Sequence, residues 1–155
     1  MTTRTVSLAE GYTLRRATLF DVRALHRLET VIFPRDAYPY FDLTLMFLWA
    51  GITNLKITTP DGAMVAFASC SRGLSPERGW IVTLGVAPAH QQRGLGSYLL
   101  DMCEKRLKRP VVRLTVREGN TPAIQLYQRA GYKTIERKWG YYRDGETGLV
   151  MEKRM

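Results

Sequence analysis

The chain has 155 residues, of which 45% are hydrophobic and 24% are charged, a balance typical of a single globular domain over residues 1–155. No apolar run is as long as a membrane span, and the first residues, MTTRTVSLAEG, lack the apolar core of a signal peptide, so we expect a cytoplasmic protein without a membrane partner. The net charge is +9, but the sequence has no RNA-binding motif, zinc finger or dense run of Lys and Arg, so no specific nucleic-acid partner is expected.

The first half of the chain predicts two helices between strands. Thr18 is a suitable cap for the first helix, in which apolar residues recur at helical spacing until Pro34 ends it. Asp42 is expected to cap the second helix and Gly51 to end it. Pro60-Asp61-Gly62 predicts a hairpin turn. The predicted elements are a strand at 12–16, helices at 19–33 and 41–49, and strands at 55–59, 63–71 and 80–86.

The second half predicts a strand between two helices, followed by a hairpin. Asn120 or Thr121 caps the shorter helix, and Gly131 ends it. The predicted elements are a helix at 95–107, a strand at 111–116, a short helix up to 130, and strands at 133–142 and 148–154 around a turn at Asp144-Gly145. The complete order is β-α-α-β-β-β-α-β-α-β-β. It predicts an α/β (α+β) fold with one mixed, mostly antiparallel sheet flanked by helices on both faces.

The positive charge is concentrated in the second part of the chain. Residues 1–90 hold 9 Lys or Arg against 7 Asp or Glu, whereas residues 91–155 hold 14 against 7. A polyanionic ligand and a set of solvated basic faces explain this equally well. Cys70 and Cys103 form no CxxC pair, so we expect two buried, reduced thiols and no metal site.

A polar, glycine-rich loop begins the basic part. The segment QQRGLG, residues 91–96, joins a predicted strand to a predicted helix, and the free N–H groups at a helix N-terminus attract phosphates. Gly94 and Gly96 lack the Cβ atoms that would block a close approach. The loop has neither the Lys nor the hydroxyl of a P-loop, and it lacks the GxGxxG that a dinucleotide-binding fold carries after its first strand. By itself, this GxG also fits an ordinary strand-to-helix turn.

Three segments in order give the loop a context: VAPAHQQRGLG, VREGNTPAIQLYQRAGY and GYYRDGETGLVMEK. With the predicted element order, they resemble the GNAT superfamily of acetyl-CoA-dependent N-acetyltransferases over roughly residues 12–155. The resemblance implies an enzyme in which the amides of residues 92–97 bind the CoA pyrophosphate and a splayed strand pairs with pantetheine. The implied acetyl-CoA contacts are Leu84, Val86, Gln91, Gln92, Arg93, Gly94, Leu95, Gly96, Ser97, Asn120 and Tyr127.

Tyr127 is the catalytic residue that the resemblance implies. Expulsion of CoA as a thiolate requires a proton, and a phenol with a pKa of about 10 is a usable donor. Asn120 and Tyr127 lie two helical turns apart, so they can share a face. From the residues alone, a core aromatic would be the preferred interpretation of Tyr127, and the resemblance reverses that preference.

Within the superfamily, two segments are most similar to protein N-terminal acetyltransferases, including the ribosomal-protein-alanine type. They are VIFPRDAYPYF and GYYRDGETGLVMEK, and the resemblance implies that they frame a groove for a peptide N-terminus. The implied acceptor walls are Phe33, Pro34 and Tyr38 on one side and Tyr141 and Tyr142 on the other. An aromatic loop that merely packs on a closing hairpin is an equally good interpretation.

One position departs from the resemblance. The ribosomal-protein type has Glu where this chain has Thr115, and a eukaryotic branch has His there with Tyr at the position of Trp80, so the familiar general base is missing. The candidate replacements are Glu29, Asp36, Glu118 and a water held by Thr115, whereas His26 and His90 are not expected to serve. At pH 7, an α-amine with a pKa of about 7.7–8.0 is roughly 10–17% neutral, against about 0.04% for lysine. A missing base therefore favours an N-terminal α-amine.

Three functions stay open at this point. The first is acetyl transfer from acetyl-CoA to the α-amine of a protein or peptide N-terminus, ribosomal proteins among them. The second is acetylation of a small amine such as a polyamine or an aminoglycoside, whose positive charge would favour an acidic pocket. The third is an acetyl-CoA-binding module without catalysis.

Overall fold

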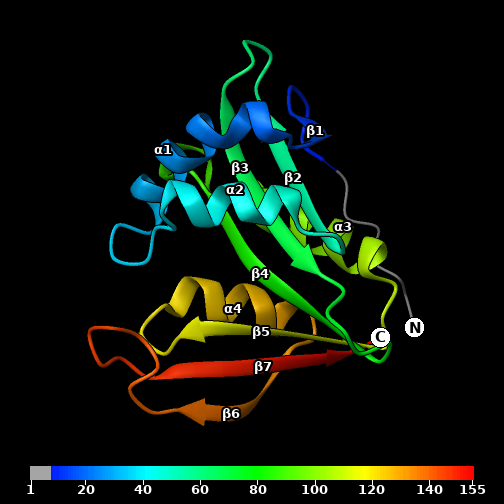
Figure 1. Ribbon diagram of the computed structural model, residues 1–155, viewed down its shortest axis with the longest axis vertical. Coiled ribbons are helices and arrows are strands. Elements are labelled where there is room, and N and C mark those ends of the chain that lie inside the picture. The colour runs from blue at the N-terminus through cyan, green and yellow to red at the C-terminus, as the bar shows by residue number, and fades with distance from the viewer. Residues whose placement is uncertain (1–7) are drawn as a thin grey trace.

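The structure is a computed structural model that describes residues 8–155. The first seven residues, for which we predict no signal peptide, lie outside this range. The helices are α1 (Val22–Ile32), α2 (Tyr40–Leu48), α3 (Leu95–Leu107) and α4 (Thr121–Arg129) (Figure 1). The strands are β1 (Thr13–Arg16), β2 (Ile52–Thr58), β3 (Met64–Ser71), β4 (Arg78–Val86), β5 (Val111–Arg117), β6 (Lys133–Lys138) and β7 (Gly148–Arg154). This is the predicted order of elements, and the predicted fold class is confirmed.

The seven strands form one sheet in the order β1-β2-β3-β4-β5-β7-β6. Neighbouring strands are antiparallel except for β4 and β5, which run parallel. Only Arg78–Trp80 of β4 pairs with β5, at Val111–Arg113. Beyond these three pairs the two strands separate, and Figure 1 shows the opening between them. The separation exposes the inner edges of both strands in the middle of the sheet.

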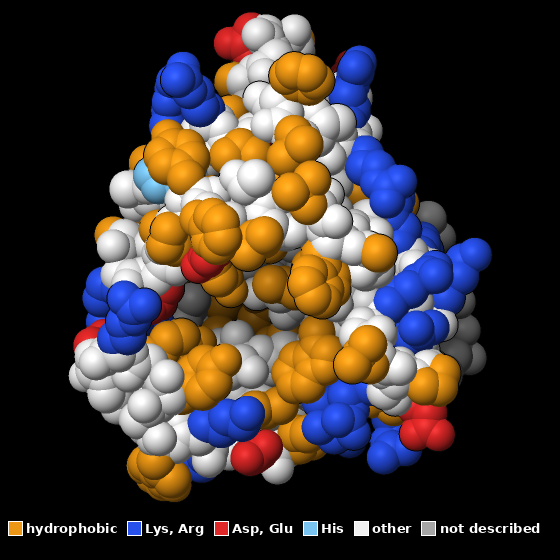
Figure 2. Space-filling model, viewed as in Figure 1, with side chains coloured by type: hydrophobic (Ala, Val, Ile, Leu, Met, Phe, Trp, Pro, Cys, Tyr) orange, Lys and Arg blue, Asp and Glu red, His pale blue; other side chains and the backbone are white. Residues whose placement is uncertain are grey.

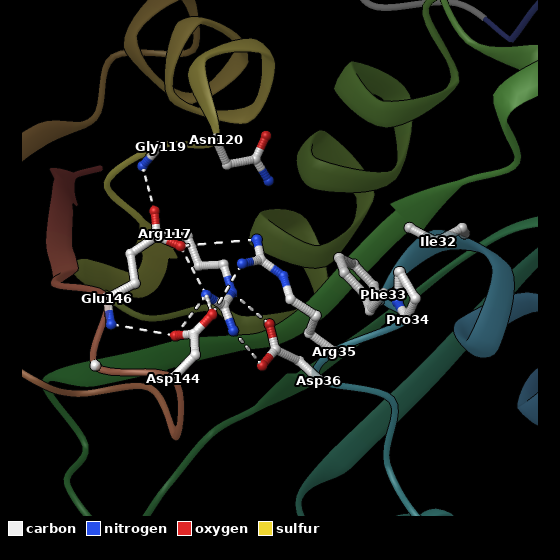
Figure 3. Close-up of a pocket in the computed structure, with 11 residues that line it drawn as sticks. Ile32, Phe33, Pro34, Arg35, Asp36, Arg117, Gly119, Asn120, Asp144 and Glu146 are labelled. Carbon is white, nitrogen blue, oxygen red and sulfur yellow. Dashed lines mark hydrogen bonds and ion pairs between the residues drawn. The ribbon is translucent and has the colours of Figure 1, made fainter.

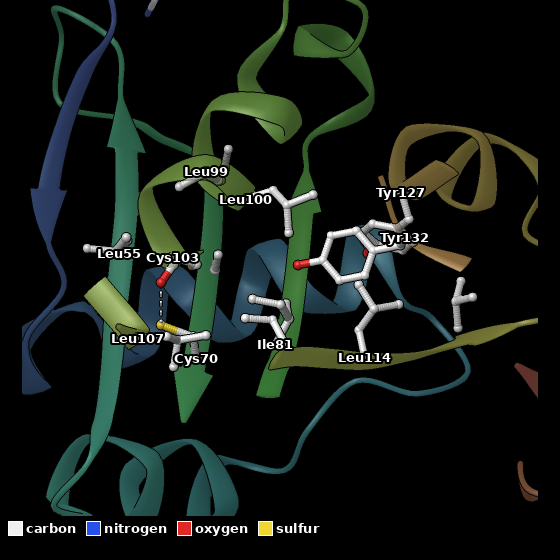
Figure 4. Packing of buried hydrophobic residues seen from close by; sticks show 14 of the residues in the cluster. Leu55, Cys70, Ile81, Leu99, Leu100, Cys103, Leu107, Leu114, Tyr127 and Tyr132 are labelled. Carbon is white, nitrogen blue, oxygen red and sulfur yellow. Dashed lines mark hydrogen bonds between the residues drawn. The ribbon is translucent and has the colours of Figure 1, made fainter. Parts of the chain in front are cut away.

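Helices cover both faces of the sheet, each over its own core. On one face, α3 and α4 pack on alternate residues of β5 such as Val112 and Leu114, in the larger core cluster that Figure 4 shows in part. On the other face, α1 and α2 enclose a smaller cluster around Phe67 of β3. The side chains of β5 therefore divide by the alternation of the strand, so that Thr115 and Arg117 point away from the larger core.

Some predicted boundaries were wrong. Pro39, not Asp42, is the N-cap residue of α2, and Asp42 lies in its first turn. The first turn of the first helix is a 3-10 turn at Leu19–Asp21. The strand expected to reach residue 142 ends at Lys138, and residues 139–147 form a loop. This loop lies opposite the α1–α2 loop, so the aromatic residues that suggested a strand instead help to frame the site.

Two smaller findings complete the fold. Cys70 and Cys103 are buried free thiols, as predicted. Within residues 8–155, no helix combines the length and the hydropathy needed to span a membrane.

Candidate active site

A cavity of about 150 Å³ occupies the opening between β4 and β5. Figure 2 shows the hollow on this face, between the α1–α2 layer and the part formed by β5 to β7, with hydrophobic side chains around it. Residues from both faces of the sheet meet in this cavity. Ala123 and Tyr127 come from α4, whereas Glu29 and Tyr38 come from α1 and the loop that follows it. The opening therefore connects the two faces of the sheet.

The glycine loop lies between β4 and α3 and has an unusual backbone. Gln92 and Gly94 have positive φ angles of 62° and 79°, and Gly94 is the N-cap residue of α3. Gly96 allows close packing, because a Cβ there would lie 3.3 Å from Cδ1 of Leu126 on α4. The two glycines therefore have different roles, and sequence reasoning did not predict the role of Gly96 between α3 and α4.

Polar contacts hold this loop against its neighbours. Gln91 Nε2 donates to the carbonyl oxygen of Val86 at 3.2 Å, and Arg93 Nη1 donates to the hydroxyl oxygen of Tyr12 at 2.9 Å. The Tyr12 hydroxyl is also hydrogen-bonded to His90 Nδ1 at 2.8 Å. Of the two β4 residues predicted to bind cofactor, Leu84 lines the cavity, and Val86 lies nearer the loop that follows β4.

Tyr127 and Asn120 come together at the cavity from α4. Tyr127 is 7% exposed, and burial raises its pKa to about 12. It also packs edge-on against Tyr132 in the core, as Figure 4 shows, so the two interpretations of this residue are compatible. Asn120 caps α4, as predicted, with its Oδ1 accepting from the backbone N–H of Ala123 at 3.3 Å.

The predicted acceptor walls come together in part. Phe33 and Tyr38 line the cavity from one side, and Tyr142 lines it from the other. Pro34 lies instead on a neighbouring cavity at the mouth of the groove. The ring of Tyr141 packs against Gly148, where a Cβ would lie 3.0 Å from the ring, and it supports Tyr142 edge-on at 5.0 Å.

The guanidinium of Arg117 connects the two acceptor walls, a role that the sequence did not indicate. This guanidinium donates to both carboxylate oxygens of Asp36 at 2.6 and 2.7 Å and lies 4.2 Å from the centre of the Tyr142 ring. It also donates to Asp144 at 2.9 Å and to Glu146 at 2.6 Å, as Figure 3 shows. These carboxylates raise the pKa of Arg117, and a guanidinium stays charged at any ordinary pH.

The mouth of the groove is therefore an ion-pair network across three segments. Arg35 adds a second cation and donates to Asp144 at 2.8 Å. Asp36 belongs to the α1–α2 loop, Arg117 to β5, and Asp144 and Glu146 to the β6–β7 loop. The alternation of β5 places Arg117 on the same face as Thr115, and this was the sequence pattern that indicated Arg117. No pattern in the sequence identifies the carboxylates that pair with it.

The structure also places the candidates for the missing base. Thr115 lines the cavity, and its methyl group packs closely on Gly148. A Cβ added to Gly148 would lie 3.1 Å from this methyl carbon. Glu29 is fully buried, and its carboxylate accepts from the backbone N–H of Tyr38 at 2.8 Å and from the Thr83 hydroxyl at 3.5 Å. Burial raises the pKa of Glu29 to about 6. Trp80 lies where β4 and β5 still pair, outside the lining of the cavity.

His26 and His90 contribute nothing to this cavity. His26 stacks on Tyr40 with ring centres 3.9 Å apart, and His90 is held by Tyr12. Among residues 8–155, His, Cys, Asp and Glu form no group of three or more that could hold a metal ion.

Comparison with known proteins agrees with this geometry. The chain is 28% identical over 154 residues to an N-alpha-acetyltransferase of Sulfurisphaera tokodaii, which covers 90% of this chain and 91% of that protein. The crystal structure of the ribosomal-protein-S18-alanine N-acetyltransferase from Escherichia coli is similar with a TM-score of 0.81 at 23% identity, over 92% of this chain and 93% of that one. Arabidopsis thaliana NAA60 in complex with acetyl-CoA gives 0.82 at 20% identity, over 93% and 98%. Residues 21–132, most of the chain, match the acetyltransferase (GNAT) family, and the protein therefore belongs to this family.

Proposed function

We propose that the protein transfers an acetyl group from acetyl-CoA to the α-amine of a protein or peptide N-terminus. The observation that carries this proposal is the cavity between β4 and β5, which is lined by Tyr127 from one face and by the aromatic walls from the other. The relative named N-alpha-acetyltransferase and the neighbour solved with acetyl-CoA support it. A ribosomal protein is one such acceptor, as in the name of the Escherichia coli neighbour.

The donor is proposed to lie along β4 and the glycine loop. The amides of residues 92–97 at the N-terminus of α3 bind the pyrophosphate, because unpaired N–H groups and the helix dipole attract anions. The pantetheine arm pairs with the free edge of β4 at Leu84 and Val86 and passes Asn120, which brings the thioester to Tyr127. Gln91 and Arg93 brace the loop from the side.

The reaction is a direct attack of the amine on the thioester. The nitrogen forms a bond to the carbonyl carbon, and the carbon–sulfur bond then breaks to release a thiolate. Tyr127 gives its proton to this sulfur and regains one from the acylated nitrogen, so that the products are the amide and the CoA thiol. Burial raises the pKa of a thiol as well as that of a phenol, so both groups shift in the same direction inside the cavity.

Acetyl-CoA affinity should depend on Gly94. In Gly94→Glu, a carboxylate enters the phosphate site, and we expect the Kd for acetyl-CoA to rise at least about tenfold, or ~1.4 kcal/mol, in calorimetric titration. Gly51→Glu is the matched control, because Gly51 also has a positive φ (89°) and open space around its Cα, and it precedes β2 at the opposite end of the sheet from the loop. A folded Gly94→Glu protein with unchanged affinity would remove the loop from the donor site.

The acceptor should be identified by a panel of amines. In an assay of CoA release, we expect kcat/KM for an N-terminal peptide to rise with pH and level off near the pKa of the peptide, about 7.7–8.0. Thr115→Glu places a carboxylate in the cavity and should move that rise to lower pH.

Turnover of spermidine or an aminoglycoside well above every peptide would instead indicate a small-molecule enzyme. Binding of acetyl-CoA without turnover of any amine would indicate a binding module.

A further inference from the structure

We infer that Glu29 is the general base that accepts the proton of the attacking amine. This inference rests on the proposed function, because it concerns the acceptor half of the same cavity. Glu29 belongs to α1 and Thr115 to β5, so Glu29 occupies a different element from the base that the family resemblance led us to expect.

Glu29 is a buried carboxylate on the apolar stripe of α1. It is 0% exposed and is buried together with Leu25 and Leu28, which belong to the core of that face. A carboxylate has about four acceptor positions, and this one uses two, of which the 3.5 Å contact with Thr83 is long for a hydrogen bond. The oxygen nearer Thr83 therefore keeps acceptor capacity at the cavity.

No cation neutralises this carboxylate among the described residues, since none of the ion pairs found in residues 8–155 includes Glu29. Burying an unpaired charge is unfavourable, and the protein retains it at the point where an amine must lose a proton. The pKa of about 6 follows from this burial, so Glu29 is a carboxylate at neutral pH and a stronger base than an exposed glutamate.

The other candidate bases are occupied elsewhere. Both carboxylate oxygens of Asp36 accept hydrogen bonds from Arg117, so they are not available to take a proton from the acceptor amine. Glu118 pairs with Arg137 outside the lining of the cavity. Thr115 has no group that titrates in this range and packs its methyl group towards Gly148.

The tyrosines around Glu29 keep their protons in the neutral range. Burial raises the pKa of Tyr38 and Tyr142 above that of an ordinary phenol, and that of Tyr127 to about 12. Asp42 lies in the first turn of α2, Arg78 begins β4 five residues before Thr83, and the described part of β3 has no charged side chain. The other charged groups at the cavity are the paired Asp36 and Arg117.

Glu29 and Tyr127 each move one proton. The neutral N-terminal amine attacks the thioester carbon, and the nitrogen gives its surplus proton to the Glu29 carboxylate once the carbon–nitrogen bond has formed. When the carbon–sulfur bond breaks, the sulfur takes the proton of Tyr127. Glu29 then passes the proton from the nitrogen to the Tyr127 phenolate through solvent, so that one neutral amine and one thioester give one amide and one thiol.

Glu29→Gln tests this assignment, because the amide oxygen can still accept from the N–H of Tyr38 while the basic group is lost. We expect kcat at saturating acetyl-CoA and peptide to fall about 10²-fold, and the rise of kcat near pH 6 to disappear. Glu104→Gln is the matched control. Glu104 is also a buried glutamate, but it binds Tyr132 and Lys153 on the other face of the sheet, so its loss should leave the pH profile unchanged.

A second variant keeps the test decisive if Glu29→Gln does not fold. Thr83→Val removes the hydroxyl that lowers the pKa of Glu29, so the rise of kcat should move to higher pH. Wild-type kcat with no rise near pH 6, or a folded Glu29→Gln variant within threefold of wild-type kcat, overturns the role of Glu29. Absence of turnover with every peptide in the wild type overturns the proposed function itself, and the two failures are therefore distinguishable.

Discussion

Tyr127→Phe is expected to lower kcat by about 10² to 10⁴ while the Kd for acetyl-CoA hardly changes. The substitution retains the ring, which packs in the core against Tyr132, and removes only the hydroxyl of this cavity-lining residue. The thiolate then leaves without a proton donor, so the chemical step slows although the donor still binds. Single-turnover kinetics with calorimetric titration of acetyl-CoA would separate these two quantities.

Tyr132→Phe is the control for this experiment. Tyr132 is buried in the same cluster, and its hydroxyl donates to Glu104 at 3.0 Å outside the site. Loss of the Tyr132 hydroxyl should lower the melting temperature more than Tyr127→Phe does, without a comparable decrease in kcat. A kcat for Tyr127→Phe within threefold of wild type would exclude Tyr127 as the proton donor.

Arg117→Gln is expected to raise the KM for peptide at least about tenfold, or ~1.4 kcal/mol, and to leave acetyl-CoA affinity unchanged. Removing the guanidinium leaves Asp144 and Glu146 with Arg35 as their remaining partner, and it removes the ion pair of Asp36. The carboxylates then repel one another across the groove, and Tyr142 loses the cation against its ring. The walls therefore separate, and initial-rate measurements over a range of peptide concentrations would detect the loss.

Arg113→Gln provides the matched control for Arg117. Arg113 is on the same face of β5, but its ion pair is with Glu152 of β7, away from the groove. Because the carboxylates of the Arg117 network are partly exposed, added salt should also raise the wild-type KM for peptide. A folded Arg117→Gln protein with a KM within twofold of wild type would show that the network does not set the geometry of the groove.

Local patterns were sufficient to predict the order of elements. Gly131, Asn120 and the turn at residues 60–62 each have a local chemical reason to end, cap or reverse the chain, and the structure places all three where expected. The strand predicted to reach residue 142 was wrong, because β6 ends at Lys138 although aromatic residues favour strands. Tyr141 and Tyr142 are held by tertiary contacts with Gly148 and Arg117, which local propensity does not describe.

Spacing within one loop or one helix places the glycine loop and the pair Asn120 and Tyr127. Their roles, and the two acceptor walls, came from the family resemblance and not from spacing. Asp36 and Arg117 are 81 residues apart, and Glu29 and Thr83 are 54 apart. The charge pattern of the sequence could not indicate which carboxylate is neutralised at the mouth of the groove and which is buried unpaired. Glu29 did leave one signal, because it is a charged residue on the apolar stripe of α1.

The short pairing between β4 and β5 also has a consequence for folding stability. Three residue pairs join the part of the sheet formed by β1 to β4 to the part formed by β5 to β7. In the proposed mode of binding, the pantetheine arm supplies hydrogen bonds that β5 would supply in a continuous sheet, so the co-substrate completes the sheet. A ligand that binds only the folded state stabilises it by about 2.7 kcal/mol at 100 times its Kd. The cellular supply of acetyl-CoA would then control how long the folded enzyme survives as well as how fast it works.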